Sequence, residues 1–244
     1  MSALSIRNLV KSFGGLLATD NLTFEVEEGQ SVGLIGPNGA GKTTVFSQIM
    51  GELRQTGGGI ELFGSDISAM TTPQRIRAGV SRTYQMPRPF HELSVLENIR
   101  IGLAPNNVWQ LITRLPDRDR EAEIALSVGL QKSAFERTPT ELSMGDLRKL
   151  EFARTLATGS KVMLLDEVFA GLTVGEIHVM SDLIQNLRED GLTFVIVSHD
   201  LKALEPLVDR VVAIEQGRKI AEGGFREVID HPTVRASYLG GGHG

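Results

Sequence analysis

Two hydrophobic patterns along the chain predict two kinds of strand. In residues 3–26 apolar and polar side chains alternate, and Gly14-Gly15 interrupts them, which predicts antiparallel strands joined by a turn. Apolar runs without alternation are typical of strands buried on both faces of a parallel sheet. Such runs occur within residues 31–35, 161–167 and 192–197. The pattern therefore predicts an α/β fold with an N-terminal antiparallel region and a mostly parallel core.

Helical patterns fill much of the remaining chain. Between residues 87 and 156 the strand pattern disappears, and helices are predicted at 95–102, 118–128 and 144–158. Gly57-Gly58-Gly59 is predicted to interrupt regular secondary structure before the next strand. The other predicted elements are helices at 43–50, 73–79 and 175–187 and strands at 60–63, 80–85, 210–215 and 218–222.

This order of elements predicts a single domain built from a core and an insertion. At 244 residues the chain exceeds the usual ~150 per domain, yet it suits one α/β domain that carries a subdomain. We expect the core at about 1–86 and 157–239, a helical subdomain at about 87–156, and a flexible glycine-rich tail at 240–244.

Composition narrows the classes of partner. The net charge is −5 and Lys and Arg do not cluster, which argues against nucleic acid as the main partner. The chain has no cysteine, so disulfides and thiolate metal sites are excluded. It shows neither a basic segment followed by an apolar run at its N-terminus nor an apolar run of about 18 residues anywhere. Any membrane contact is expected to go through another protein or a surface patch.

The most specific motif lies between a predicted strand and a predicted helix. It matches G-x-x-x-x-G-K-[ST], in which glycines let backbone N–H groups turn toward a polyphosphate and the following helix adds its positive dipole end. Lys42 is expected to reach the β- and γ-phosphates, and the Thr43 hydroxyl to bind magnesium. A chance glycine-rich turn is the alternative, which this setting argues against. The residues are Gly36, Pro37, Asn38, Gly39, Ala40, Gly41, Lys42, Thr43 and Thr44.

Two acidic residues end the central apolar run. Asp166 and Glu167 would lie at the carboxyl edge of a parallel sheet, beside the phosphate loop. Asp166 is then placed to hold magnesium, and Glu167 to orient and deprotonate an attacking water. A solvated turn is the alternative for such a pair.

Three further residues have two interpretations each. His199 follows another predicted parallel strand and is either structural or within reach of a γ-phosphate. Gln85 is either a surface side chain or, through its amide oxygen, a magnesium ligand. Phe13 is either a strand-end hydrophobe or a ring on which a base stacks. The residues alone leave these choices open.

The helix expected at 144–158 begins with a capping signal. Ser143 and Asp146 have the S-x-x-D spacing of a capping box, and Leu142-Ser143-x-Gly145 stands just before the first helical turn. Four features now follow one another along the chain: the phosphate loop, Gln85, this segment, and Asp166-Glu167 followed by His199. In that order they resemble the ATP-binding subunit of ABC transporters over essentially the whole chain.

Within that family, the chain resembles importers of branched-chain amino acids and the related urea importers. The similarity lies in Phe13-Gly14-Gly15-Leu16 and in the C-terminal residues 230–240. The resemblance implies a P-loop NTPase fold related to RecA and an ATPase that uses ATP and Mg²⁺, with catalytic roles for Lys42, Glu167 and His199. It also implies that Phe13 stacks on adenine, and that Thr43, Gln85 and Asp166 hold the metal.

The resemblance further implies a shared site and membrane partners. A second ATPase subunit, identical or related, would pair head to tail and place its Ser143 and Gly145 against the γ-phosphate. Integral membrane permease subunits would dock near residues 85–97, and a periplasmic or extracellular solute-binding protein would act through them. The chain would then lie peripherally on the cytoplasmic face of the inner (plasma) membrane.

Three residues depart from the family pattern. Met144 replaces a glycine and Asp146 a glutamine in the segment after Ser143, and Thr173 stands where an aspartate or asparagine is common. Asp146 would place a carboxylate near the partner's γ-phosphate unless it caps its own helix. Thr173 can hydrogen-bond across a dimer but supplies no charge. These departures make a low-turnover regulatory ATP-binding clamp one alternative to an importer. A lipopolysaccharide-type export ATPase is another, because such exporters share much of the C-terminal pattern.

Overall fold

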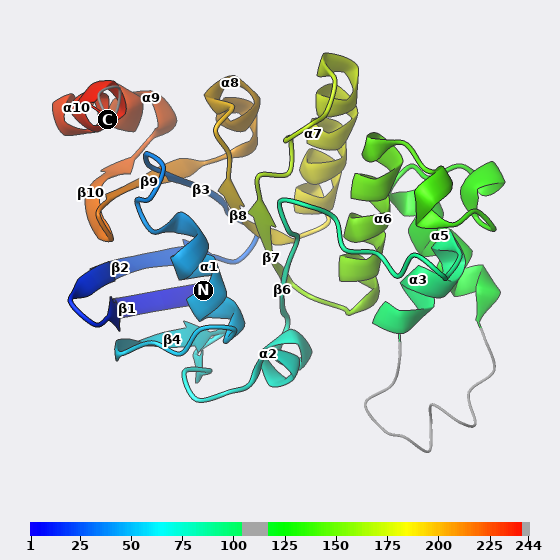
Figure 1. Ribbon diagram of the computed structural model, residues 1–244, viewed down its shortest axis with the longest axis horizontal. Coiled ribbons are helices and arrows are strands. Elements are labelled where there is room, and N and C mark those ends of the chain that lie inside the picture. Colours follow the sequence, from blue (N-terminus) through cyan, green and yellow to red (C-terminus); the bar gives the residue numbers. More distant parts are fainter. Residues whose placement is uncertain (104–116, 241–244) are drawn as a thin grey trace.

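The computed structural model describes residues 1–103 and 117–240 and contains two sheets (Figure 1). The smaller sheet has the strand order β2-β1-β4-β5, and every neighbouring pair in it is antiparallel. Its strands are β1 (Ser2–Phe13), β2 (Leu16–Glu27), β4 (Gly57–Leu62) and β5 (Ser65–Asp66). The predicted antiparallel N-terminal region is confirmed, with Gly14 and Gly15 at the turn.

The larger sheet has the order β10-β9-β3-β8-β7-β6 and is parallel except at β10. Every residue of β3, β7 and β8 is buried, as the apolar runs predicted. The strands are β3 (Ser31–Ile35), β6 (Val80–Arg82), β7 (Val162–Asp166), β8 (Thr193–Val197), β9 (Arg210–Glu215) and β10 (Arg218–Gly223). The predicted mostly parallel core is confirmed.

Helix α1 (Lys42–Met50) lies between the two sheets (Figure 1). Val45, Phe46 and Ile49 of α1 pack in one hydrophobic cluster with the smaller sheet and with one face of the larger sheet. Alternate residues of the same strands, such as Leu165 of β7, belong to a second cluster on the other face. The two-residue side-chain period of each strand thus divides the core into two layers. The α/β class predicted from the sequence is confirmed by this arrangement.

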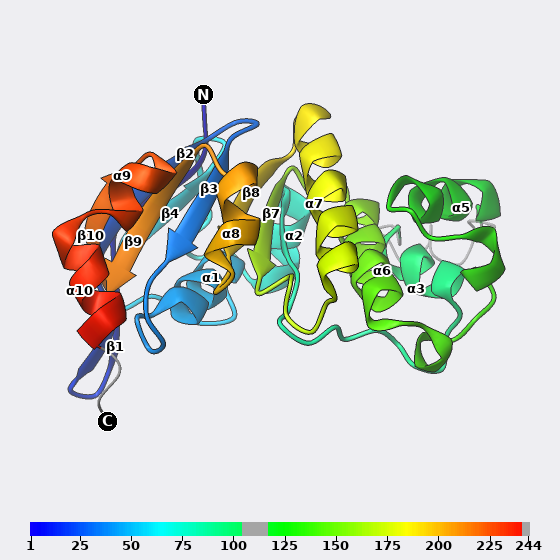
Figure 2. The same ribbon diagram turned by 90° about the horizontal axis from the view of Figure 1, so that it is seen from above.

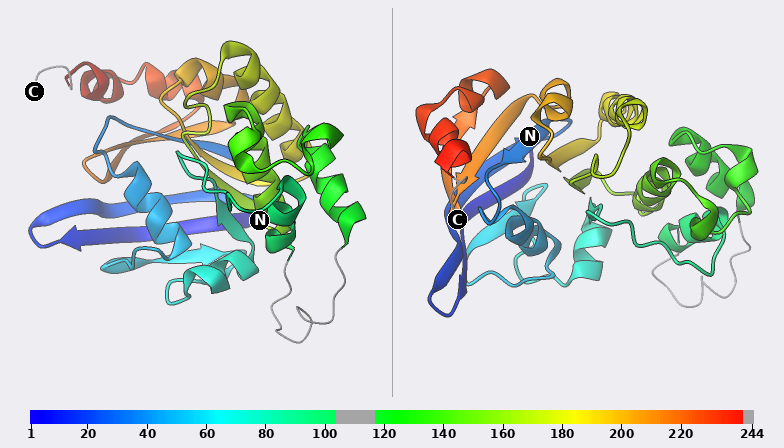
Figure 3. Two further views of the ribbon diagram at one scale, coloured as in Figure 1. Left: turned by 45° about the vertical axis from the view of Figure 1, so that its right-hand side comes forward. Right: turned by 45° about the horizontal axis from the view of Figure 1, so that its top comes forward.

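The remaining helices cover the outer face and the two ends of the larger sheet. Among the described residues, only helical elements connect β6 to β7, and they gather at one end of the molecule (Figures 2 and 3). At the opposite end, the C-terminal helices lie beside β10. The longer helices are α2 (Thr72–Ala78), α3 (Val95–Gly102), α5 (Arg118–Ser127), α6 (Met144–Ala157), α7 (Val174–Glu189), α9 (Phe225–Ile229) and α10 (Pro232–Gly240). The short ones are η1 (Lys132–Ala134), η2 (Pro139–Glu141), α8 (Leu201–Leu204) and η3 (Glu205–Leu207).

Within these residues no helix is both long enough and apolar enough to cross a membrane. The tail predicted at 240–244 is described only at Gly240, which ends α10, and its other residues lie outside the described part of the chain.

Two predicted boundaries were wrong. The glycines at 57–59 belong to β4 and do not interrupt it, because Gly58 takes a φ of +80° and lets β4 pass close to β1. The strand predicted at 80–85 stops at Arg82. Beyond it, Tyr84 donates its backbone N–H to the Glu151 side chain, and its carbonyl accepts from Arg148. Because α6 takes these backbone groups, the chain leaves the sheet before Gln85.

Replacing Gly58 with alanine is expected to destabilise the fold more than the same change at Gly64. Both residues have positive φ, +80° and +73°. A Cβ at Gly58 would lie 2.2 Å from the carbonyl oxygen of Asn8, whereas none of the described atoms lies within 4 Å at Gly64. Backbone strain alone costs about 1–2 kcal/mol, and the clash should add about 1–3 kcal/mol. Urea unfolding measures both losses. Equal losses would show that β1 moves away freely.

Candidate functional site

The carboxyl edge of the larger sheet gathers the predicted polar residues in one cleft. Residues 36–44 follow β3, Asp166 ends β7, and His199 comes just after β8, which lies between those two strands. The cleft has a volume of about 1060 Å³. The predicted residues that line it are Phe13, Asn38, Gly39, Ala40, Gly41, Lys42, Thr43, Thr44, Gln85, Asp166, Glu167 and His199. One surface therefore offers backbone N–H groups, an ammonium, carboxylates, an amide and an imidazole.

The phosphate loop closes onto its own lysine. The Nζ of Lys42 donates to the carbonyls of Gly36 (2.6 Å) and Pro37 (3.0 Å), which form the start of the loop. Burial lowers the pKa of Lys42, while the carboxylates of Glu167 and Asp166 act to raise it. Gly41 precedes α1 with a φ of +106°, and a Cβ there would lie 2.4 Å from the Ala18 carbonyl. The loop thus requires glycine at position 41 and holds a buried cation.

Glu167 has a strained backbone and a free carboxylate oxygen. Its φ is +51°, which is rare for a residue with a side chain and typical of functional sites. Its Oε2 accepts from the backbone N–H of His199 at 3.2 Å. Its Oε1 is buried, lies 3.2 Å from Nε2 of His199, and has no hydrogen-bond partner among the described residues. A carboxylate oxygen without a donor is available to accept a proton from water.

Asp166 is not free in this structure. Its Oδ2 accepts from Nη2 of Arg82 at 2.6 Å, and both side chains are buried. Arg82 was not among the predicted site residues. The available signal was a charged residue inside the strand predicted at 80–85, three positions before Gln85.

Phe13 lies at the outer end of the cleft. Phe13 is 49% exposed, and the ammonium of Lys11 lies 4.9 Å from the centroid of its ring. A ring exposed at a cleft wall is accessible for stacking with a planar ligand.

Ser143 and Gly145 lie away from this cleft. Together with residues of α7 they line a separate hollow of about 130 Å³. Ser143 caps α6 as predicted, because its Oγ accepts from the backbone N–H of Asp146 at 3.1 Å. The reciprocal half of the predicted capping box is absent at this described helix start, since the Asp146 carboxylate lies 3.2 Å from Nζ of Lys149. A lysine thus neutralises the carboxylate that departs from the family pattern.

Thr173 also serves its own chain. Its hydroxyl donates to the Glu176 carboxylate at 2.8 Å and accepts from the Glu176 backbone N–H, which caps α7. The expected role of Thr173 across a dimer is therefore not apparent within one chain.

The C-terminal elements support the phosphate loop from behind. The hydroxyl of Tyr238 on α10 accepts from the backbone N–H of Gly36 at 2.9 Å. The N–H of Gly217, at the β9–β10 turn, donates to the Ala40 carbonyl at 2.9 Å. Neither contact was predicted, because nothing in residues 217–240 indicates that they reach a loop about 200 residues earlier in the chain.

Comparisons with known proteins agree with this geometry. A model of the ABC transporter family matches residues 19–170, and one of the branched-chain amino acid ATP-binding cassette transporter matches residues 218–244. The high-affinity branched-chain amino acid transport ATP-binding protein LivG of Salmonella typhimurium is 35% identical over 97% of both chains. The corresponding protein BraF of Pseudomonas aeruginosa is 36% identical over 97% of both chains.

Solved structures that resemble this chain are also ATP-binding cassettes of ABC transporters. A nucleotide-free ATP-binding cassette from an ABC transporter has a TM-score of 0.87 at 29% identity, over 98% of this chain and 99% of that chain. A cassette in its ADP conformation also has a TM-score of 0.87, at 30% identity and the same coverage. A dimeric bacterial cassette with a TM-score of 0.80 at 22% identity, over 91% of this chain and 99% of that chain, shares the fold. The chain therefore belongs to the ABC transporter family as an ATP-binding cassette that hydrolyses ATP.

Proposed function

We propose that this cassette drives an ABC importer for branched-chain amino acids or a chemically similar small solute. The observation that carries the ATPase part is the cleft, in which the phosphate loop, Asp166, Glu167 and His199 meet at one sheet edge. The solute class is supported by LivG and BraF, which are named as branched-chain amino acid transport proteins, and by the family model that matches residues 218–244. Import by this chain rests on the same similarity.

The residues of the cleft suit ATP together with Mg²⁺. Backbone N–H groups of residues 36–44 and the Lys42 ammonium would hold the phosphates, and Phe13 would stack on the base. Thr43, Gln85 and Asp166 line the same cleft and offer hydroxyl, amide and carboxylate oxygens, which are the hard donors that Mg²⁺ prefers. When bound, Mg²⁺ would neutralise charge on the β- and γ-phosphates.

Glu167 and His199 are the proposed catalytic pair. The unpartnered Oε1 of Glu167 would accept a proton from the attacking water. His199 lies beside that oxygen and would contact the γ-phosphate. Lys42 would exchange its two carbonyl partners for phosphate oxygens, and the pull of a phosphate on a buried ammonium favours that exchange.

A second cassette would complete the site. Ser143 and Gly145 at the start of α6 would face the γ-phosphate bound by the other subunit, where the helix N-terminus favours an anion. This proposal accounts for their distance from the cleft of their own chain. The helical elements between β6 and β7 would form the subdomain that contacts membrane permease subunits, on the cytoplasmic face of the membrane, and an external solute-binding protein would select the cargo.

Glu167→Gln is expected to lower the ATPase rate about 100-fold or more, because the amide cannot take a proton from water. Nucleotide binding should persist, so the variant should accumulate as an ATP-bound dimer. Steady-state phosphate release and size-exclusion chromatography with light scattering measure these outcomes. Glu189→Gln, an exposed change at the end of α7, is the control. A Glu167→Gln monomer under saturating ATP would refute the shared site. Wild-type turnover no faster than that of Glu167→Gln would favour the regulatory clamp.

The solute class is tested by uptake in cells whose own copy of the gene is inactivated. Labelled leucine, isoleucine and valine are expected to enter more slowly, and the wild-type gene but not Glu167→Gln should restore the rate. Loss of urea uptake alone would assign the chain to urea import. Unchanged uptake of all four solutes together with a defect in lipopolysaccharide export would contradict the importer proposal.

Tyr238→Phe is expected to weaken ATP binding with little change in maximal rate. The substitution keeps the ring and removes only the oxygen that accepts from Gly36, so the start of the phosphate loop loses one hydrogen bond. A lost hydrogen bond of this kind corresponds to a rise in KM for ATP of about threefold or more. Steady-state kinetics measure the change, and Arg235→Ala, exposed on the same helix, is the control. An unchanged KM would show that α10 does not support the loop.

A further inference from the structure

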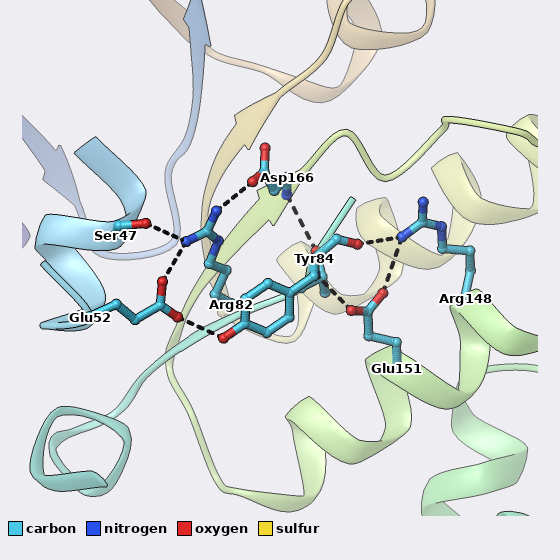
Figure 4. A network of polar contacts seen from close by, with 8 residues as sticks. Ser47, Glu52, Arg82, Tyr84, Arg148, Glu151 and Asp166 are labelled. Atoms are coloured by element: carbon cyan, nitrogen blue, oxygen red, sulfur yellow. Dashed lines mark hydrogen bonds and ion pairs between the residues drawn. The ribbon is translucent and has the colours of Figure 1, made fainter. Parts of the chain in front are cut away.

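Arg82 is a buried cation held by groups from three parts of the core (Figure 4). Its side chain is 4% exposed. Its Nη2 donates to Asp166 at the end of β7, and its Nη1 donates to Ser47 of α1 (3.0 Å) and to Glu52 just after α1 (2.9 Å). Its Nε has no hydrogen-bond partner among the described residues. The guanidinium is therefore held through its two terminal nitrogens, and a carboxylate lies at each.

The two carboxylates share one positive charge in unequal surroundings. The Asp166 side chain is 7% exposed and lines the nucleotide cleft, whereas Glu52 is 29% exposed and does not line it. The rings of Phe46 and Tyr84 lie 5.6 and 5.1 Å from the guanidinium carbon and shield it from water. Because water screens buried charges weakly, the attraction of Arg82 for Asp166 depends on the charge of Glu52.

Tyr84 fixes Glu52 in this arrangement. The Tyr84 hydroxyl donates to Oε1 of Glu52 at 2.7 Å, while Oε2 accepts from Arg82. Burial, together with the hydrogen bond and charge of Glu52, raises the pKa of Tyr84 to about 12, so the hydroxyl keeps its proton near neutral pH. Each Glu52 oxygen thus has its own donor, and the carboxylate cannot turn away without losing one.

We infer that Arg82 is a positioning residue that sets how strongly Asp166 binds Mg²⁺, and that Glu52 tunes this strength from outside the cleft. The inference rests on the proposed role of Asp166 as a magnesium ligand. Arg82 orients the carboxylate through Oδ2, but its charge also repels a metal cation nearby. Glu52 offsets part of that charge and thereby makes metal binding more favourable.

The inference predicts opposite effects for the two residues. Without the charge of Glu52, Arg82 would hold Asp166 more tightly and repel the metal more strongly. Without the charge of Arg82, the Asp166 carboxylate would be fully available to the metal, although less well oriented. A purely structural ion pair that only joins β6, β7 and α1 would instead lower stability in both variants, without opposite shifts in metal affinity.

The test is the Mg²⁺ dependence of binding of a non-hydrolysable ATP analogue to the full chain, measured by titration calorimetry. Glu52→Gln is expected to raise the Mg²⁺ concentration at half-saturation about threefold or more, and Arg82→Gln to lower it by a similar factor. Glu61→Gln is the matched control, because Glu61 is 30% exposed and pairs with Arg7 at 2.9 Å in the smaller sheet. It should leave the Mg²⁺ dependence unchanged.

The outcomes separate this inference from the proposed function. Wild-type protein without Mg²⁺-dependent binding would contradict the proposed magnesium site. Wild-type dependence with shifts in the same direction for Glu52→Gln and Arg82→Gln would overturn only the inference. If thermal unfolding shows that Arg82→Gln does not fold, the test is the Mg²⁺ dependence of Glu52→Gln compared with that of Glu61→Gln. An effect of Glu52→Gln no larger than that of the control overturns the inference, and a selective rise supports it.

Discussion

The parallel ladder of β3, β8 and β7 determines where every polar group of the cleft lies. Gly33 pairs with Ile196, and Ile196 also pairs with Leu165 on its other side. The three strands therefore end almost level, and the phosphate loop, His199 and the two acids leave the sheet at one edge. A slip of one residue between β8 and either neighbour would exchange the two faces of a strand whose residues are all buried. The packing of alternate side chains in two different clusters thus secures the geometry of the site.

A buried polar network extends this edge toward α6 (Figure 4). Arg82 joins Asp166 to Glu52, and Glu52 accepts from Tyr84. The backbone of Tyr84 is held in turn by Glu151 and Arg148 of α6. Burial raises the pKa of Glu151, but the Tyr84 N–H and the Arg148 charge oppose that shift. Since unpaired buried polar groups are costly, α6 is expected to move together with residues 84 and 85.

Local motifs and apolar periodicity predicted every described strand except β5, most of the longer helices and the residues that converge in the cleft, but not α9 or α10. They failed where a long-range contact decides the conformation. The three glycines at 57–59 resemble a loop in sequence. In the structure they lie within β4, where the close approach of β1 requires glycine at position 58. Gln85 lies outside a strand because side chains of α6 take the neighbouring backbone groups. Arg82 and Tyr238 escaped notice because their partners lie 84 and 202 positions away, at a separation that no motif spans.

The surface around Ser143 complements the open cleft. Two exposed apolar side chains lie here: Met144 at the start of α6 is 44% exposed, and Val179 of α7, which lines the same hollow as Ser143 and Gly145, is 50% exposed. The phosphate cleft in turn lacks any group from α6 among its described lining residues. Burying the apolar group and bringing a helix N-terminus to a bound triphosphate would both be achieved by one contact with a second cassette. Under this interpretation ATP would be part of the interface, and hydrolysis followed by release of inorganic phosphate would remove the anion that the two subunits share.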